Sequence, residues 1–374
     1  MAYQNVGTPV FYIDNYIYLR ALGLNPRTYI SETDMWSYED TPEHQSVLGN
    51  PEAFTLSPQI ARNFLGGADG EFTIVIPCGS KFRELEFSTS GNMTLYCALL
   101  NHNLGDKDLR ISYQFYTDSA SAENQNDASS GVPILNKDTS MENGSTIFHT
   151  ANSAGTLGDY IGINISHSDY LNTNPMPSDI NIGAFSAGVR YKMPHSPELD
   201  LVMKITHDGL DKTTTLGGSV LSNIRYVGTP VWGNGDKFVA PFGVGGTSEN
   251  NYLDGAIRNG RREWELTFMH IGDSDLFSSN YSSGSYFEYG ATGYDSDDID
   301  NQNQFEYNMF NDNSFIAQVW NKTLGGALPF IFQPDSDNEN PDQFCIAKFD
   351  MKSLEISQVA FKSYEISLKI KEVW

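Results

Sequence analysis

Cysteine is scarce in this 374-residue chain, and the few copies are far apart. They are Cys78, Cys97 and Cys345, an odd number with no close spacing, so the sequence does not predict a disulfide framework. Free cysteines are among the most buried residue types in proteins. We therefore expect these thiols to be reduced and buried, and Cys78 and Cys97 could be neighbours in one sheet.

Basic residues are also few: 23 Lys and Arg stand against 47 Asp and Glu, a formal net charge of −24. A surface of this charge repels phosphate, which argues against nucleic acid as a partner. Attraction to anionic lipid is disfavoured for the same reason. The acidic residues are spread over the predicted loops, so solubility is the first interpretation and ion binding the second.

Long hydrophobic runs are absent. The first residues, MAYQNVGTPVFYID, contain no basic stretch followed by an apolar run, so no signal peptide is predicted. No segment is apolar for long enough to form a membrane-spanning helix. We expect a protein that is synthesised in a cytoplasm and does not insert into a membrane.

Motifs of catalysis are lacking as well. The seven histidines fit no compact metal-ligand spacing, and GGSVLS at 217–222 does not match the nucleophile elbow GxSxG. The glycine-rich segments lack the Lys-Ser/Thr of a phosphate-binding loop. No spacing singles out a carboxylate pair for glycoside hydrolysis, although many pairs could meet in space. The prediction is a protein without enzymatic activity and without a cofactor.

One aspartate-rich run raises the question of calcium. Asp295, Asp297, Asp298 and Asp300 resemble part of an EF-hand loop, and Glu306 stands at the twelfth position. The sixth position, which should be glycine, is Asp300. The run therefore favours a solvated loop and remains a weak candidate for a calcium site.

What the chain does contain is aromatic bulk together with residues that form turns. It has 22 Phe, 20 Tyr, 5 Trp and 33 Gly, a mixture that suits many short strands joined by turns. Seven or so strands are predicted in the middle of the chain, with a long polar loop at 119–158, which favours a β-sandwich of jelly-roll type. They lie at 72–78, 82–88, 93–105, 109–118, 159–166, 179–191 and 199–209.

The pentapeptide VGTPV occurs twice, at 6–10 and 227–231. Toward the N-terminus a strand broken near Asp14-Asn15 is predicted. After the second copy the pattern changes to a strand at 262–271, a helix at 314–326, two short strands and an alternating terminal strand. These differences favour a host domain of residues 1–59 and 225–374 that is interrupted by a β-sandwich module at 60–224. An internal repeat and chance remain the alternatives.

Two stretches carry a resemblance to a known group of proteins. The C-terminal part resembles the C-terminal half of tail proteins of tailed bacteriophages. The segments that carry this resemblance are GRREWELTFMHIGDSDLF, the helix that ends in LGG, PFIFQPDSDNENPDQFCIAKFD and SYEISLKIKEVW. YCALLNHNLGDKDLRISYQ and DYIGINIS…DINIGAF are similar to the galactose-binding-like jelly rolls of phage structural proteins. The resemblance implies an all-β, mainly antiparallel fold with one helix, in which a jelly-roll module is inserted in a tail-protein domain.

The same resemblance implies a virion component of the distal-tail or baseplate-hub type. Such proteins form rings, commonly of three or six copies, that link the tail tube to the tip or fibres, so the expected partners are the chain itself and other tail proteins. Edge strands and the terminal strand would join neighbouring subunits. The candidates for this interface, each of which could equally be a core residue, are Trp264, Phe268, Trp320, Phe330, Phe332 and Trp374.

Three alternatives remain open from the sequence. Residues 60–224 could recognise a host surface glycan, and Asn101, His102 and Asn103 at the turn of the module would be a sugar or metal contact or, more simply, a turn held by backbone hydrogen bonds. A head-decoration protein is a second structural hypothesis. A carbohydrate-active enzyme on a jelly roll is the third.

Overall fold

The structure is a computed structural model that describes part of the chain. The described residues are 6–22, 29–31, 56, 62–64, 71–77, 93–105, 107–116, 131–136, 144–149, 160–167, 177, 180–206, 210–224, 229–230, 258–277, 314–340 and 343–373.

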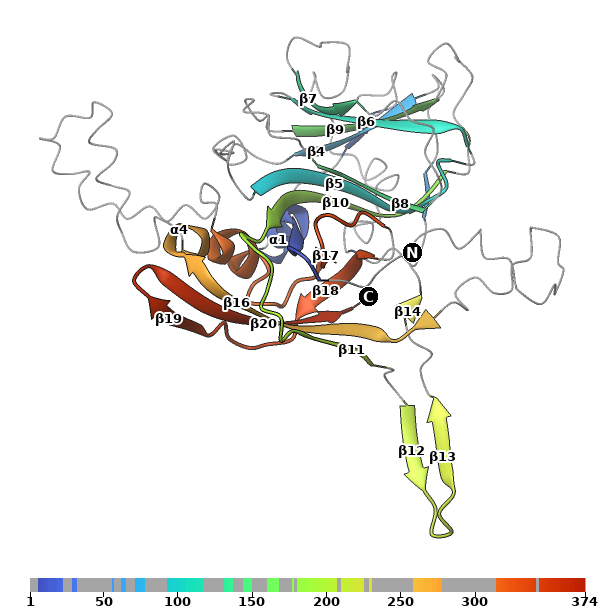
Figure 1. The fold of residues 1–374 in the computed structure, drawn as a ribbon. Coiled ribbons are helices and arrows are strands. Elements are labelled where there is room, and N and C mark those ends of the chain that lie inside the picture. The colour runs from blue at the N-terminus through green and yellow to red at the C-terminus, as the bar shows by residue number, and fades with distance from the viewer. Residues whose placement is uncertain are drawn as a thin grey trace, which may run out of the picture.

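The described chain folds mainly into two antiparallel sheets, one above the other (Figure 1). The larger sheet follows a path through nine strands, and two more strands pair at its side. In path order these are β11 (Val202–Thr206), β16 (Arg261–Gly272), β20 (Ser363–Glu372), β18 (Cys345–Phe349), β17 (Phe330–Gln333), β1 (Val10–Asp14), β10 (Ile180–Lys192), β5 (Met93–His102) and β8 (Gly144–His149), with β19 (Ile356–Ala360) beside β20 and β3 (Arg62–Phe64) beside β10.

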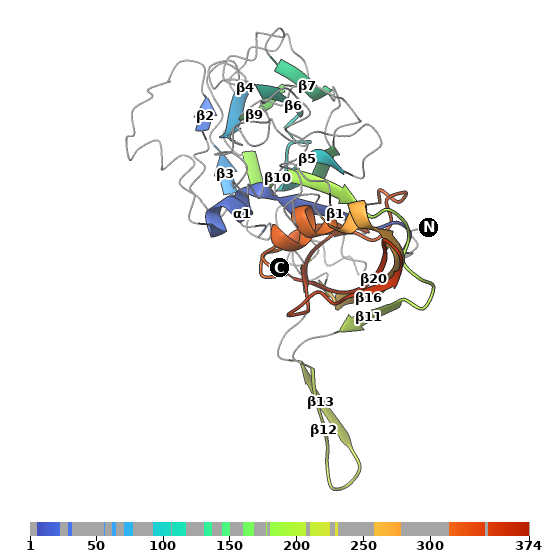
Figure 2. The ribbon, with the colours of Figure 1, turned by 90° about the vertical axis from the view of Figure 1, so that its left-hand side faces the viewer.

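The smaller sheet has five strands and lies over the β10–β5–β8 end of the larger one (Figures 1 and 2). Its order is β2 (Tyr29–Ser31), β4 (Glu71–Pro77), β9 (Tyr160–His167), β6 (Leu109–Tyr116) and β7 (Gly131–Asn136). Two further antiparallel pairs stand apart: β12 (Leu210–Thr214) with β13 (Val220–Ile224), and β14 (Thr229–Pro230) with β15 (Arg258–Asn259). The helical segments in the described residues are α1 (Asn15–Ala21), α4 (Asp273–Leu276) and η6 (Ile316–Asn321).

The all-β, mainly antiparallel fold class is therefore confirmed. The jelly-roll connectivity of the middle section stays a prediction. Nearly every predicted strand that falls in the described residues is present, and β7 and β8 lie within 119–158, where a long loop was predicted. Strand 82–88 lies outside the described residues.

Strand β1 is buried on both faces, and each face packs into a different hydrophobic cluster. Phe11 and Ile13 belong to a cluster formed with β16, β17, β18, β20 and η6. Val10 and Tyr12 belong to a second cluster with Tyr96 and other residues of β5 and β10. This two-period alternation is what a strand buried on both faces requires.

The larger sheet also crosses the predicted domain boundaries. Strand β10 pairs with β1 on one edge and with β5 on the other, so the host segment and the middle section share one hydrogen-bonded sheet. Strand β11, which lies within 60–224 in sequence, pairs with β16 of the host part. The division into 1–59 with 225–374 and 60–224 stays a prediction, but the two parts are continuous in the sheet.

The prediction of a strand that resumes after Asp14 was wrong, because helix α1 begins there. The Asp14 Oδ1 atom accepts hydrogen bonds from the backbone N–H groups of Tyr16 (2.7 Å) and Ile17 (3.0 Å). These are the bonds of a helix N-cap, for which aspartate is a preferred residue.

The backbones of β1 and β10 approach closely near the start of this helix. A side chain at position 188 would collide with the Ile13 carbonyl oxygen, so Gly188 is required.

The helix predicted at 314–326 is confirmed in place and takes the π form over Ile316–Asn321. The sequence predicts an apolar stripe of Phe315, Ile316, Val319 and Trp320. The first three are buried in the core and Trp320 is partly buried. Gly325 and Gly326 follow with positive φ angles of 66° and 92°, which glycine adopts without strain and which end the helix as predicted.

Candidate interaction surface

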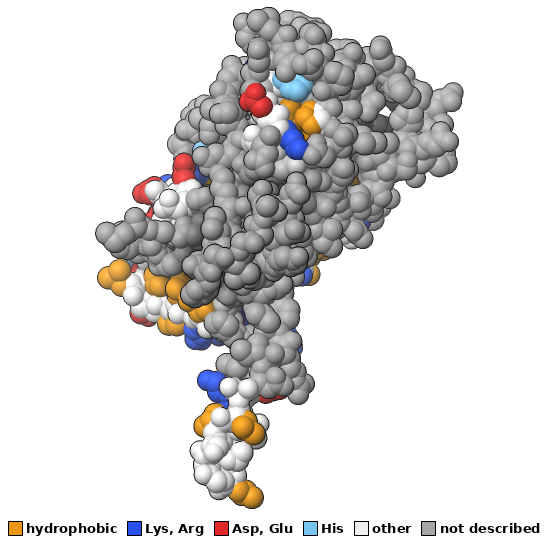
Figure 3. All heavy atoms as spheres, turned by 90° about the vertical axis from the view of Figure 1, so that its right-hand side faces the viewer, with side chains coloured by type: hydrophobic (Ala, Val, Ile, Leu, Met, Phe, Trp, Pro, Cys, Tyr) orange, Lys and Arg blue, Asp and Glu red, His pale blue; other side chains and the backbone are white. Residues whose placement is uncertain are grey.

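The hairpin β12–β13 projects from the body of the molecule as a narrow arm (Figures 1 and 3). Its two strands pair from Leu210 opposite Ile224 to Thr214 opposite Val220. The loop at its end is closed by the N–H of Gly218, which donates to the Thr215 carbonyl over 2.9 Å. Gly218 has φ of 83°, the left-handed conformation that a short hairpin loop needs.

The arm carries exposed apolar side chains on both of its faces. Leu216 at the tip is fully exposed, and Val220 and Leu221 are 63% and 61% exposed. Residues 220 and 221 are consecutive in a strand, so their side chains point to opposite faces. Exposed apolar side chains close together on a projecting hairpin make it a candidate for contact with another surface.

Strand β11, which precedes the arm, forms one end of the larger sheet in the described part of the chain. It pairs with β16 along one edge, from Val202 opposite Glu265 to Thr206 opposite Arg261. Val202 and Ile205 are 41% and 59% exposed. An exposed strand at the end of a sheet offers backbone N–H and C=O groups to another chain.

Ion pairs cover the outer face of β11, β16 and β20. The Lys204 Nζ atom lies 2.7 Å from Glu265 Oε1, and Lys371 Nζ lies 2.8 Å from Glu263 Oε1. The hydrogen bond between Lys204 and Glu265 raises the pKa of the lysine and lowers the pKa of the glutamic acid. This face is therefore charged and solvated, unlike the arm.

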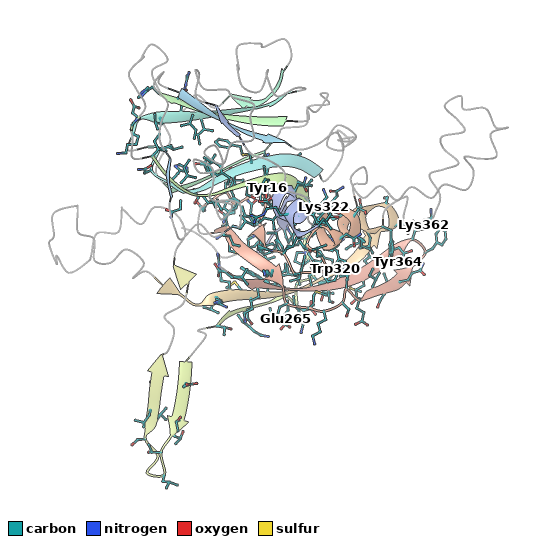
Figure 4. All side chains as sticks on the ribbon, turned by 180° about the vertical axis from the view of Figure 1, so that it is seen from behind. Tyr16, Glu265, Trp320, Lys322, Lys362 and Tyr364 are labelled. Carbon is teal, nitrogen blue, oxygen red and sulfur yellow. The ribbon has the colours of Figure 1, made fainter. Side chains whose placement is uncertain are left out.

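Another exposed apolar group lies at the turn between β19 and β20. Phe361 is 87% exposed and Val359 is 39% exposed. The Lys362 Nζ atom lies 5.9 Å from the centre of the Phe361 ring. Lys362 marks this turn in Figure 4, at the end of the β16–β20 sheet away from the arm. Just beyond the turn, a hydrogen bond with Asp273 raises the pKa of the Tyr364 hydroxyl.

Most of the interface candidates predicted from the sequence lie in the core. Trp264, Phe268, Phe330 and Phe332 are at most 1% exposed, so their side chains pack within the subunit. Trp320 is partly buried, with its ring 5.5 Å from that of Phe349. This placement agrees with the core-packing alternative. Trp374 lies outside the described residues.

The proposed joining role of the terminal strand needs a correction. Strand β20 pairs with β16 on one edge and with β18 and β19 on the other. Within the described residues, one edge of β20 is thus paired along most of its length and the other at both ends, so it offers little free ladder to a neighbour. In the described part of the chain, β11 is the strand at the end of this region of the sheet.

The module turn is built around a buried histidine. His102 is 4% exposed, and its Nε2 atom lies 2.9 Å from Thr146 Oγ1 on the adjacent strand β8. Burial lowers the pKa of His102 to about 4, so the ring is neutral at physiological pH. Asn101, with φ of 53°, donates its backbone N–H to Ser145 Oγ over 3.0 Å, and Asn103 is partly buried. These bonds fit a structural turn.

The calcium candidates Asp295, Asp297, Asp298 and Asp300 lie outside the described residues. Elsewhere, among the side chains that the structure describes, no three His, Cys, Asp or Glu are grouped so as to hold a metal ion. Cys97 and Cys345 are free and buried, as predicted. Cys78 is not among the described residues.

The sequence contained a signal for the arm that motif searching missed. Gly217-Gly218 stands between a Thr-rich stretch and Val220-Leu221, which is the pattern of a β-hairpin. The same glycines do not fit the nucleophile elbow, and their place between two strand-forming segments is the signal for a hairpin. Exposure of its apolar residues could not be read from the sequence.

Comparisons with known proteins do not assign the chain to a family. No protein-family model matches it, and no solved structure matches it. An 85-residue segment, 22% of the chain, is 33% identical to the uncharacterized membrane protein ycf78 of Bigelowiella natans. That segment covers 9% of ycf78, so the chain is similar to a small part of that protein.

Within the described ranges, no helix is both long and apolar enough to span a membrane.

Proposed function

We propose that this chain is a non-enzymatic structural subunit that assembles with copies of itself in the tail of a tailed-bacteriophage virion. The place suggested by the sequence resemblance is the distal tail or baseplate hub, in a ring of three or six copies that links the tail tube to the tip or fibres. The subunit would be synthesised in the host cytoplasm and join other tail proteins there.

The observation that supports assembly is the arm β12–β13. A two-stranded hairpin is at best marginally stable in water, and a protein gains nothing within one subunit by exposing Leu216, Val220 and Leu221. Covering each of these side chains in a contact would contribute roughly 2 kcal/mol. An arm that becomes buried on assembly accounts for both the projection and the apolar side chains.

The net charge of −24 is consistent with a subunit that stays dispersed until it assembles. Like charges repel at long range and are screened beyond about 8 Å at physiological salt. Assembly then depends on short-range apolar contacts, and it should be favoured by salt. The ion-paired face of β11, β16 and β20 would remain in water.

The test is the mass of the purified full-length protein by light scattering, with negative-stain imaging of the same sample. A closed ring of three or six copies supports the proposal. A protein that stays monomeric over the accessible concentration and salt range contradicts it. Localisation in the particle by labelled antibody then separates a tail subunit from a head-decoration protein.

A further inference from the structure

Two of the exposed apolar groups in the described part of the chain lie far apart on the molecule. One is the arm with Leu216, Val220 and Leu221, and the other is the β19–β20 turn with Val359 and Phe361. Figure 4 shows the arm and Lys362 of that turn on opposite sides of the molecule. The exposed group at the β19–β20 turn is called the turn patch below.

Local folding does not account for the residues at either site. Short turns favour Gly, Asn, Asp, Ser and Pro, each for a conformational reason. Here the turns carry Leu216 and Phe361, which are fully exposed and 87% exposed. Large apolar side chains at such positions gain free energy when another surface covers them.

Charge favours a second copy of this chain as that surface. The arm, residues 210–224, contains one acid and one base, Asp211 and Lys212, which cancel. Residues 351–362, which include the turn patch, contain two bases and one acid, Lys352, Lys362 and Glu355. In a chain with a net charge of −24, these are segments through which two copies can approach without repulsion.

We propose that the arm of one copy packs against the turn patch of the next, so that subunits join head to tail. A contact between two different patches is heterologous, and it leaves one arm and one turn patch free at the ends of any open chain. Such a chain closes into a ring when the rotation between subunits is a whole fraction of a turn. This inference rests on the proposed function and names its joint.

The apolar side chains on both faces of the arm suit this arrangement. Val220 and Leu221 point to opposite faces, so one flat surface covers only one of them. The turn patch also supplies the backbone of β19, which pairs with β20 alone in the described part of the chain. We therefore expect the arm to lie along the β19 edge, with Phe361 against one face.

The experiment uses two full-length variants that each remove one partner. The arm variant carries Leu216→Ser, Val220→Thr and Leu221→Thr. The turn variant carries Val359→Thr and Phe361→Ser. Sedimentation at several concentrations should show an oligomer for the unaltered chain and a monomer for each variant, a loss of at least tenfold in association constant.

Mixing the two variants gives the sharpest result. The arm variant keeps an intact turn patch, and the turn variant keeps an intact arm, so one productive contact remains. A one-to-one mixture should form a heterodimer and nothing larger, because both remaining surfaces of the dimer are defective. A contact between two arms would give no such complex.

Two controls separate folding from association. Leu22→Ser removes an apolar side chain that is 50% exposed after helix α1, and this variant should keep the mass of the unaltered chain. Thermal unfolding of the arm and turn variants should match that of the unaltered chain, since their substituted side chains lie outside both cores.

The outcomes that overturn the inference differ from those that overturn the proposed function. An oligomer that survives in the turn variant, or a mixture that stays monomeric, rules out the head-to-tail joint but leaves assembly standing. An unaltered chain that is monomeric throughout contradicts the proposed function. Loss of binding to phosphatidylcholine vesicles in the arm variant of such a monomer would make a lipid surface the occupant of the arm.

Discussion

Apolar side chains are buried in the core around β1 but exposed on the arm β12–β13. The Phe11 ring lies 5.4 to 5.9 Å from the rings of Phe315, Phe330, Phe332 and Phe349, with no exposed surface. Leu216 on the arm is fully exposed. The core residue is stabilised by its own subunit, whereas the arm residue is available to another. The comparison separates the side chains that fold the chain from those that can join copies of it.

Truncation of the core residue should have the largest effect. Phe11→Ala removes a ring with four aromatic neighbours and should lower the free energy of unfolding by about 3–5 kcal/mol. Urea unfolding followed by fluorescence measures this loss. Phe361→Ala is the matched control and should change stability by less than about 0.5 kcal/mol. Equal losses in the two variants would refute the distinction between the core and the exposed turn.

A largely buried ion pair should contribute more to the free energy of unfolding than an exposed one. Arg262 donates through Nε and Nη2 to Glu372, both at 3.2 Å, and lies over Trp264 at 5.4 Å. Glu372→Ala leaves a largely buried guanidinium without this partner and should cost about 3 kcal/mol. Glu265→Ala, which removes the exposed pair with Lys204, should cost less than about 1 kcal/mol. Thermal unfolding of both variants tests the ranking.

The core could be predicted well where a strand alternates between buried and exposed residues. Ile366, Leu368 and Ile370 of β20 are buried as predicted, because period-two alternation reports one covered face. In β16 the same alternation places Trp264, Leu266 and Phe268 on one face, and the structure shows that this face is the buried one. Helix η6 was found because its apolar stripe and terminal glycines agree. Each of these signals is local in the sequence.

The interaction surface could not be predicted, because exposure depends on contacts between distant segments. Large aromatic residues were chosen as interface candidates by type, yet the core takes such residues first, and Trp264 and Phe332 lie inside. The arm has apolar residues on both faces, so it shows no alternation. Helix α1 was missed because the capping role of Asp14 was not weighed against the aromatic alternation around it.

The buried carboxyl group of Asp14 should make the stability of the fold depend on pH. Desolvation raises the pKa of Asp14 to about 7, from 3.8 in an exposed residue. Its contribution to stability is therefore complete below about pH 4 and is lost as the pH rises through about 7, at about 1.4 kcal/mol for each unit of pKa difference.

Asp14→Asn keeps a side-chain oxygen for the helix cap and removes the titration. The variant should gain stability relative to the unaltered chain between pH 4 and pH 7, and the difference should level off above that range. Chemical unfolding of both proteins at several pH values measures it. A constant difference would show that Asp14 is not responsible for the pH dependence.

The smallest effect on the stability of the subunit is expected in the arm. Its amide hydrogens should exchange faster than those of the core in the free subunit and become protected on assembly. The strands β12 and β13 pair only with each other in the described part of the chain, and residues 211–214 and 220–222 are exposed, so local opening should cost little free energy. In the dilute subunit, amide hydrogens of the arm should exchange within seconds, while those of Trp264 and Leu266 in β16 stay protected. In the assembled protein the arm should become protected as well, because its backbone would then lie between two subunits. Hydrogen exchange by mass spectrometry, before and after assembly, distinguishes this outcome from an arm that is already rigid in the monomer, whose exchange would not change.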